Sequence, residues 1–379
     1  MKNITIYFGP KAECQKIFPD EYTSLTELVQ HHDSYQKTFR FTQDDQPIKP
    51  IEKQYFENVV AFSEQYAGIT EGAVQSFLTI LEFYEIDNLY LQNPPEQIKK
   101  QLQEAFTDIV NEEQYCYKNF TKAMFFKFYR GFNENIIGQQ DVRDQLAYSL
   151  YNLIDSKKKK PMVLMLYGKS GVGKTETAKY ISEIYGQKLF RKQLSMFQSS
   201  EFQEYLFGGS HSQSSFARDL LERESNVILL DEFDKPHPVF HSAFYQLFDE
   251  GVYEDKNYKV PLYNSLIICT SNYNSENEIR KHLGDPIFYR FDKIIRYGDL
   301  SVESIEKIID KQLEEKYQKL SKKEKGIVQK EYICEKLKSI SNLLNNARQI
   351  SKIIEEYFSI QLVNDLIEKE MEKKKNGQA

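Results

Sequence analysis

Residues 168–175 read Gly-Lys-Ser-Gly-Val-Gly-Lys-Thr and follow the pattern G-x-x-x-x-G-K-[ST]. Glycines at these places let the backbone turn tightly, so that several N–H groups point at one anion. The apolar run Met162–Tyr167 before the stretch predicts a buried strand, and residues 176–185 after it predict a helix that ends at Gly186. A strand, a glycine loop and a helix in this order predict a loop that binds phosphate groups.

The residue types of this loop predict what its positions do. The Lys174 ammonium can reach the β- and γ-phosphates of a nucleotide, and the Thr175 hydroxyl can bind magnesium. The loop residues expected to bind the nucleotide are Gly168, Ser170, Gly171, Val172, Gly173, Lys174 and Thr175. We therefore expect ATP and Mg²⁺ as the bound species.

Composition is that of an ordinary globular protein. The chain has 379 residues, of which 40% are hydrophobic and 28% charged, and a formal net charge of −6. This length predicts two or three domains. No strongly basic domain indicates nucleic-acid binding, so we expect no nucleic-acid partner.

The cysteines and the apolar runs indicate the cellular compartment of the protein. Four widely spaced cysteines, none in a C-x-x-C pair, indicate neither a disulfide framework nor a zinc site. The first apolar run is too short for a signal peptide, and no run is long enough for a membrane span. We expect a cytoplasmic protein with no membrane partner.

The residue pattern divides the chain into three regions. Residues 1–129 predict a mostly helical N-terminal domain of unknown function, with a strand at 4–8 and helices at 59–67, 73–84 and 97–106. Residues 130–299 alternate strand and helix signals, which predicts a large α/β nucleotide-binding subdomain with a parallel sheet. Residues 300–379 carry only helical patterns, which predicts a small helical lid.

Residues 114–129 alternate basic and aromatic side chains. One interpretation is a surface on which nucleic-acid bases stack. The other is an amphipathic helix packed on the following domain, and this is the interpretation we favour.

Polar residues follow two more predicted strands. The apolar run Asn226–Leu230 ends in Asp231 and Glu232, at the place where α/β sheets bind ligands. Asp231 can join the magnesium shell, and Glu232 can polarise an attacking water. A third apolar run ends before Asn272, which can orient that water or simply form a turn.

Several separate motifs resemble the Clp-type AAA+ ATPases, the group of protein unfoldases and disaggregases. Residues 227–238 resemble the Walker B segment, and Ile137-Gly138-Gln139 resembles the motif on the adenine side of the site. Residues 270–272 resemble sensor 1, and residues 288–292 the segment with the arginine finger. Residues 346–350 resemble sensor 2 at the start of a lid helix. The resemblance covers roughly residues 133–365.

This resemblance implies a role for each matched position. It makes Ile137 a nucleotide contact, Asp231 and Thr175 magnesium ligands, and Glu232 the base that activates water. It makes Asn272 the residue that positions this water and Arg348 the sensor of the γ-phosphate. Arg290 would reach the nucleotide of a neighbouring subunit, which implies a homo-oligomer, by resemblance a hexamer.

One segment departs from the family. Between the loop helix and the acidic pair, the family carries an aromatic pore loop that grips polypeptide. Here residues 205–218 place no tyrosine between glycines, and Phe207 and His211 are the only candidates for that part. Two functions therefore stay open. One is an ATP-hydrolysing ring that remodels a protein bound through residues 1–129, and the other is an ATP-switched regulatory or scaffold ATPase that controls a partner effector without threading.

Overall fold

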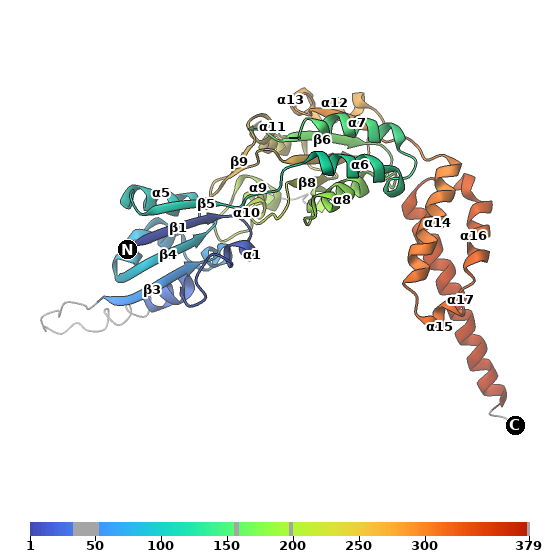
Figure 1. Ribbon diagram of the computed structural model, residues 1–379, viewed down its shortest axis with the longest axis horizontal. Helices are drawn as coiled ribbons and strands as arrows, with labels where there is room; N and C mark the ends of the chain where they lie inside the picture. Colours follow the sequence, from blue (N-terminus) through green and yellow to red (C-terminus); the bar gives the residue numbers. More distant parts are fainter. Residues whose placement is uncertain (33–52, 155–158, 197–199, 377–379) are drawn as a thin grey trace, which may run out of the picture.

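The computed structural model describes residues 1–32, 53–154, 159–196 and 200–376. Figure 1 shows an N-terminal α/β unit beside a central α/β unit, with the C-terminal helices on the far side of the central unit. The last helix projects away from the body. No helix of the described ranges is long and apolar enough to cross a membrane.

The N-terminal unit is built on a parallel sheet, so the prediction of a mostly helical domain is wrong. Its five strands lie in the order β2-β3-β4-β1-β5, and every ladder is parallel. The strands are β1 (Asn3–Phe8), β2 (Thr23–Ser24), β3 (Gln54–Ala61), β4 (Tyr84–Gln92) and β5 (Val110–Gln114). Of these, only β1 was predicted.

The predicted helix over residues 59–67 is the clearest error. Residues 59–61 end β3, and the 3-10 helix η1 (Ser63–Gly68) follows. Val59, Val60 and Ala61 are all completely buried. A parallel strand covered on both faces gives a continuous apolar run, and such a run does not distinguish strand from helix by periodicity.

The short helices of this unit cover its sheet. They include α1 (Lys11–Cys14), α3 (Glu71–Gln75), α4 (Phe77–Glu82) and α5 (Glu96–Ala105), and residues 25–32 are helical as well. The helix predicted over 73–84 is therefore divided at Ser76 between α3 and α4, and its last residue begins β4. The helix predicted over 97–106 is confirmed as α5.

The central unit carries a second five-stranded parallel sheet, as predicted. Its order is β12-β6-β11-β8-β7. The strands are β6 (Met162–Tyr167), β7 (Phe190–Gln193), β8 (Val227–Asp231), β11 (Leu266–Ser271) and β12 (Lys293–Arg296). Because all five run the same way, the glycine loop, the acidic pair and Asn272 meet at one edge.

Helices and a hairpin surround this sheet. The helices are α6 (Lys122–Asn135), α7 (Gln140–Tyr151), α8 (Lys174–Tyr185), η2 (Leu194–Met196), α9 (Ser200–Phe207), α10 (Phe216–Leu221), η3 (Pro238–Phe244), α11 (Tyr245–Glu250), α12 (Glu276–Leu283) and α13 (Asp285–Phe288). The hairpin pairs β9 (Val252–Glu254) with β10 (Lys259–Pro261).

The basic and aromatic stretch is helical only in its second half. From Lys122 onward it forms α6, which contacts α7 and α8 and buries Phe128 and Phe132 in the core of the central unit. The interpretation as an amphipathic helix is confirmed for this part. Its hydrophobic residues thus pack with residues beyond 130, across the boundary that the sequence suggested.

The C-terminal region is helical, as predicted. Its elements are α14 (Val302–Gln318), α15 (Lys322–Lys325), α16 (Lys330–Ser339), η4 (Ser341–Leu343) and α17 (Ala347–Asn376). They share a hydrophobic core of their own, centred on Ile309, Ile333 and Ile350.

Candidate active site

The glycine loop connects β6 to α8 at the carboxyl edge of the central sheet. Gly168 has φ 139°, and a Cβ there would lie 2.5 Å from the Tyr297 carbonyl oxygen. Gly171 has φ 78°, and its Cβ would lie 2.9 Å from Cβ of Asn346. Both positions therefore require glycine, for conformation and for space.

Lys174 is held inside this loop. Its Nζ donates to the carbonyl oxygens of Gly168 (2.6 Å) and Lys169 (2.7 Å), and to Asn272 Oδ1 (3.2 Å). The side chain is buried, and this burial lowers the pKa of Lys174 to about 8. A buried ammonium that is bound only by neutral oxygens is prepared for an anionic ligand.

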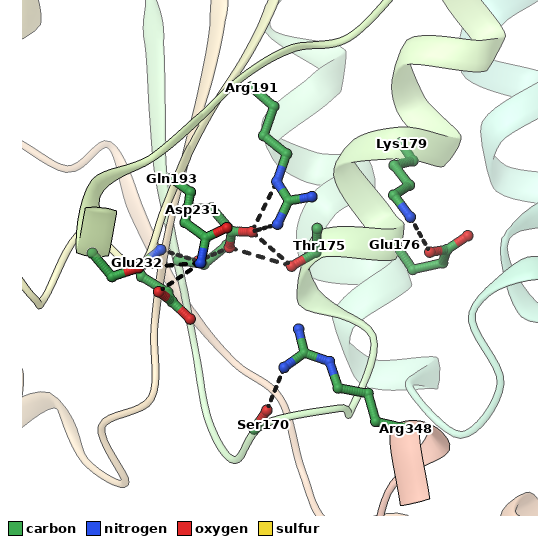
Figure 2. A network of polar contacts seen from close by, with 11 residues as sticks. Ser170, Thr175, Glu176, Lys179, Arg191, Gln193, Asp231, Glu232 and Arg348 are labelled. Carbon is green, nitrogen blue, oxygen red and sulfur yellow. Dashed lines mark hydrogen bonds and ion pairs between the residues drawn. The ribbon is translucent and has the colours of Figure 1, made fainter. Parts of the chain in front are cut away.

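Asp231 lies at the end of β8 among polar partners. Its Oδ1 accepts from Thr270 Oγ1 (2.5 Å) and from Thr175 Oγ1 (3.3 Å). Its Oδ2 accepts from Arg191 Nη2 (2.6 Å) and Nε (3.1 Å), as Figure 2 shows. A hydroxyl and a carboxylate, the two predicted metal ligands, are therefore in direct contact.

Glu232 has an unusual backbone conformation, which helps to orient its side chain. Its φ is 57°, uncommon for a residue with a side chain. Its N–H donates to Thr270 Oγ1 (3.0 Å), and its Oε2 accepts from Gln193 Nε2 (3.2 Å). Glu232 lines the same cavity as Asp231 and Lys174, and Figure 2 shows its contact with Gln193.

The helical region reaches the glycine loop directly. The Ala347 N–H donates to the Gly171 carbonyl oxygen (3.1 Å), and Arg348 Nη1 donates to Ser170 Oγ (3.1 Å). Both donors belong to the first turn of α17. The predicted sensor arginine thus lies over the loop that it is expected to monitor (Figure 2).

These residues surround one cavity of about 610 Å³. One part is lined by charged and polar groups of the loop, of β8 and of α17. Another part is lined by Ile136, Ile137, Leu300 and Ile308, which are apolar. Gln139 stabilises this apolar part of the cavity, because its Nε2 donates to the carbonyl oxygens of Val172 and Gly298. Val172 lines the cavity while its side chain is buried.

Two predicted site residues, Gly168 and Arg290, do not line this cavity, and of these Gly168 still contacts the site through its carbonyl oxygen, which accepts from Lys174. Arg290 Nε contacts Asp249 Oδ2 (2.8 Å), and the Arg290 guanidinium lies 4.4 Å from the Tyr245 ring centre. Among the described residues, the cavity lining does not include it. Within its own chain, then, Arg290 takes no part in the site.

The segment in the position of a pore loop is attached to the N-terminal unit. His211 is buried, and its Nε2 bonds the Ile69 carbonyl oxygen (2.8 Å). Asn257 Nδ2 donates to the Gly209 carbonyl oxygen (3.1 Å). Phe207 is 41% exposed. The loop is thus held from both sides, and His211 does not project from it.

The central unit is similar to known proteins. Residues 159–337 match the family model described as "AAA domain (Cdc48 subfamily)". The AAA+ ATPase ClpV1 of Pseudomonas aeruginosa is 34% identical over 160 residues, which are 39% of this chain and 18% of that protein. The chaperone protein ClpB of Mycoplasmoides gallisepticum is 22% identical over 386 residues, 96% of this chain and 51% of that protein.

A solved structure of Hsp104 with ATPγS and FITC casein shares the fold. Its TM-score is 0.55 at 13% sequence identity, over 97% of this chain and 89% of that one. Residues 159–337 therefore form a nucleotide-binding AAA+ module of the Clp/Hsp100 type. The chain spans between about a fifth and a half of the length of these curated relatives.

The residues present fit a magnesium nucleotide. Glycines at positive φ let the loop backbone turn tightly at Gly168, Gly171 and Gly173, and the Lys174 side chain is buried beside it. The Thr175 hydroxyl and the Asp231 carboxylate supply oxygen ligands of the kind that Mg²⁺ prefers.

The sequence did not point to Arg191 or Thr270 as partners of Asp231. Arg191 lies on β7, which was not predicted, and its contact depends on β7 lying beside β8. The four residues of β7 are too few to give a clear strand pattern. An arginine next to an apolar stretch is only a weak indication of a site residue.

Proposed function

We propose that the chain binds and hydrolyses ATP with Mg²⁺ and that it does so as a homo-oligomer. One observation carries the proposal. Lys174, Asp231, Glu232, Asn272 and Arg348 come from distant parts of the chain and line one cavity. Phosphoryl transfer depends on such positioning and on charge neutralisation.

Each residue has a part that its place in the cavity allows. The loop N–H groups and Lys174 bind the phosphates, and Arg348 contacts the terminal one from the lid. Thr175 and Asp231 hold Mg²⁺, which neutralises phosphate charge when bound. Asn272 orients the attacking water, and Glu232 accepts its proton.

Arg290 can complete a nucleotide site only in a neighbouring chain, not in its own. It lies on the surface of the central unit, outside its own cavity, with Asp249 as its ion-pair partner. An arginine supplied by a neighbour stabilises charge that develops in the transition state. The resemblance to the Clp type makes the closed assembly a hexamer.

Light scattering of a Glu232→Gln variant tests the proposal. This variant should bind ATP but hydrolyse it at least about a hundredfold more slowly, so that the bound state accumulates. We expect a closed oligomer with ATP and smaller species without it. A monomer or dimer in both conditions would contradict an arginine acting between subunits.

The geometry also supports a choice between the two biological functions. A ring that threads polypeptide needs a mobile aromatic loop, whereas His211 and Gly209 are bonded to neighbouring segments. This observation favours an ATP-switched regulatory or scaffold ATPase, in which the nucleotide state controls assembly and a partner effector. A protein-remodelling ring is the alternative, with residues 1–129 as the part that binds the protein.

A folded fluorescent protein with an unstructured tail distinguishes the two. A switch leaves its fluorescence unchanged in the presence of ATP while the oligomeric state changes. Loss of fluorescence that requires ATP, and that disappears in Phe207→Ala, would establish threading.

A further inference from the structure

The two parallel sheets have the same connectivity. Numbering the strands of each unit from one to five in chain order gives 2-3-4-1-5 for the first sheet and, read from the opposite edge, 2-3-4-1-5 for the second. The first strand of each unit therefore lies between the fourth and the fifth. All ladders in both sheets are parallel, so the two folds agree strand by strand.

A local contact repeats as well. Gly9 follows β1 with φ 155°, and a Cβ there would lie 2.5 Å from Cβ of Tyr115. Gly168 follows β6, and its Cβ would meet the backbone and Cβ of Tyr297. Each tyrosine directly follows the fifth strand of its sheet. The Tyr115 N–H donates to the Phe8 carbonyl oxygen, and the Tyr297 N–H donates to the Tyr167 carbonyl oxygen, both at 2.8 Å.

The residues that handle the nucleotide are missing from the first unit. When Gly9 is aligned with Gly168, the ladder registers place Phe62 at the position of Asp231 and Ser63 at that of Glu232. Only Pro10, which has no N–H, separates Gly9 from α1. Residues 1–32 and 53–115, the described part of the first unit, thus show neither a phosphate loop nor a cluster of metal ligands.

Another anion occupies the corresponding edge. The Glu222 carboxylate, at the end of α10 in the central unit, accepts three hydrogen bonds from the first unit. Its Oε2 binds the Lys11 N–H (3.0 Å), and its Oε1 binds Gln92 Nε2 (2.6 Å) and Asn93 Nδ2 (2.8 Å). Gln92 and Asn93 are completely buried. Both amides also bond the Gly9 carbonyl oxygen, which fixes them.

Neighbouring residues of the same segment extend this contact. Arg218 donates to Ser63 Oγ (3.3 Å) and to the Ser63 carbonyl oxygen (3.1 Å). The buried Arg223 guanidinium lies 3.9 Å from the centre of the Tyr117 ring. The contacts on α10 and just after it therefore meet the carboxyl edge of the first sheet, as Figure 1 shows for α1 and α10.

We propose that residues 3–115 are a second copy of the α/β unit that binds no nucleotide, and that its former ligand edge binds the central unit instead. The Glu222 carboxylate replaces a phosphate group as the anion at that edge. The N-terminal unit is thereby a fixed part of the ATPase body, which holds α10 and the preceding loop in place.

Hydrogen exchange of the full chain tests the Glu222 contact. Glu222→Gln replaces one of the two acceptor oxygens by an NH2 donor, so either the Lys11 N–H or the Gln92 and Asn93 amides lose their acceptor, and residues 9–14 should exchange about tenfold faster. Glu224→Gln is the matched control, because Glu224 is exposed and two residues away. Equal exchange in the two variants would overturn the proposal.

A second pair of variants separates this contact from a general loss of stability. Asn93→Asp places a carboxylate opposite Glu222, so exchange of residues 9–14 should increase. Adding Glu222→Gln to it should slow exchange again, because the amide can donate to the new carboxylate. A double variant that exchanges faster than Asn93→Asp alone would contradict the assigned contact.

The number of nucleotides bound per chain tests the other part of the proposal, that the N-terminal unit binds no nucleotide. Equilibrium dialysis with labelled ATP should give one nucleotide per chain, and Lys174→Ala should bind none. A second nucleotide per chain, or one retained in Lys174→Ala, would overturn the assignment of a nucleotide-free copy. The exchange experiments do not depend on ATP binding, so they distinguish failure of this inference from failure of the proposed ATPase activity.

Discussion

Arg191 Nη2 lies 2.6 Å from Asp231 Oδ2, and the pair joins β7 to the predicted metal ligand on β8. The Asp231 carboxylate is almost completely buried, whereas the arginine is partly exposed. The guanidinium thus places a positive charge next to the Asp231 carboxylate. A metal ion that binds there has to share or replace this partner.

Replacing Arg191 should change the magnesium requirement of nucleotide binding. We expect Arg191→Ala to lower the Mg²⁺ concentration for half-maximal ATP binding by about two- to fivefold, because the ion no longer competes with a partly exposed ion pair. Fluorescent-nucleotide titration at several Mg²⁺ concentrations measures this shift. Arg191→Lys keeps the charge and should behave more like the wild type. An unchanged or higher Mg²⁺ requirement in Arg191→Ala would show that the pair does not compete.

The Arg348–Ser170 contact predicts how the lid distinguishes nucleotides. Arg348→Ala should weaken ATP binding by about tenfold or more while ADP binding changes little, because the hydrogen bond that we propose for Arg348 is to the terminal phosphate. Calorimetry with both nucleotides measures the two affinities. Lys330→Ala is the control, since Lys330 lies on the lid and pairs with Glu314 outside the cavity. Equal weakening of ATP and ADP would assign Arg348 a general role.

Cys14 reports on the N-terminal unit. Burial raises the pKa of the Cys14 thiol to about 12, and the thiol is inaccessible. At pH 9 only about one thiolate in a thousand is present, so a thiol reagent should label the exposed Cys116 and leave Cys14 unmodified. Mass spectrometry of labelled peptides measures both. Rapid labelling of Cys14 in the native protein would contradict the packing of this unit.

The same thiol has a defined effect on stability. Its pKa in the folded protein is above the ordinary value of 9.0, so the folded state keeps a proton that the unfolded chain releases. The contribution is complete below pH 9 and is lost as the pH rises toward 12. Thermal unfolding of wild type and Cys14→Ala at pH 7.5 and 10.5 should therefore show the larger decrease for the wild type. An equal decrease would contradict the shift.

The nucleotide site was predictable because its signals are local. The glycine loop, the acidic pair after β8 and Asn272 after β11 each follow an apolar run, and parallel strands bring such ends together. Arg191 was not predictable in the same way, because its partner depends on which strand lies at the edge. The side-chain contacts of His211 depend on a surface of the N-terminal unit that no motif marks.

The fold of the N-terminal unit, in contrast, was not predictable from the sequence. The end of β3 is a run of three completely buried apolar residues, Val59–Ala61, which does not distinguish strand from helix by its pattern, and the region was predicted to be helical. Its likeness to the central unit lies in strand order and in the Gly9–Tyr115 contact. Phe62 and Ser63 stand where acids would be recognised, so the sequence gives no nucleotide motif to find.

In the proposed oligomer, Arg290 of a neighbouring chain completes each ATPase site. Arg290→Ala alone should bind ATP but hydrolyse it at least about a thousandfold more slowly, and Glu232→Gln alone should also be inactive. The most direct measurement is the ATPase rate of a mixture of these two variants. In mixed oligomers, the intact Arg290 of one chain meets the intact Glu232 of the next, so activity should return. A mixture as inactive as its two components, in oligomers shown to exchange subunits, would contradict it.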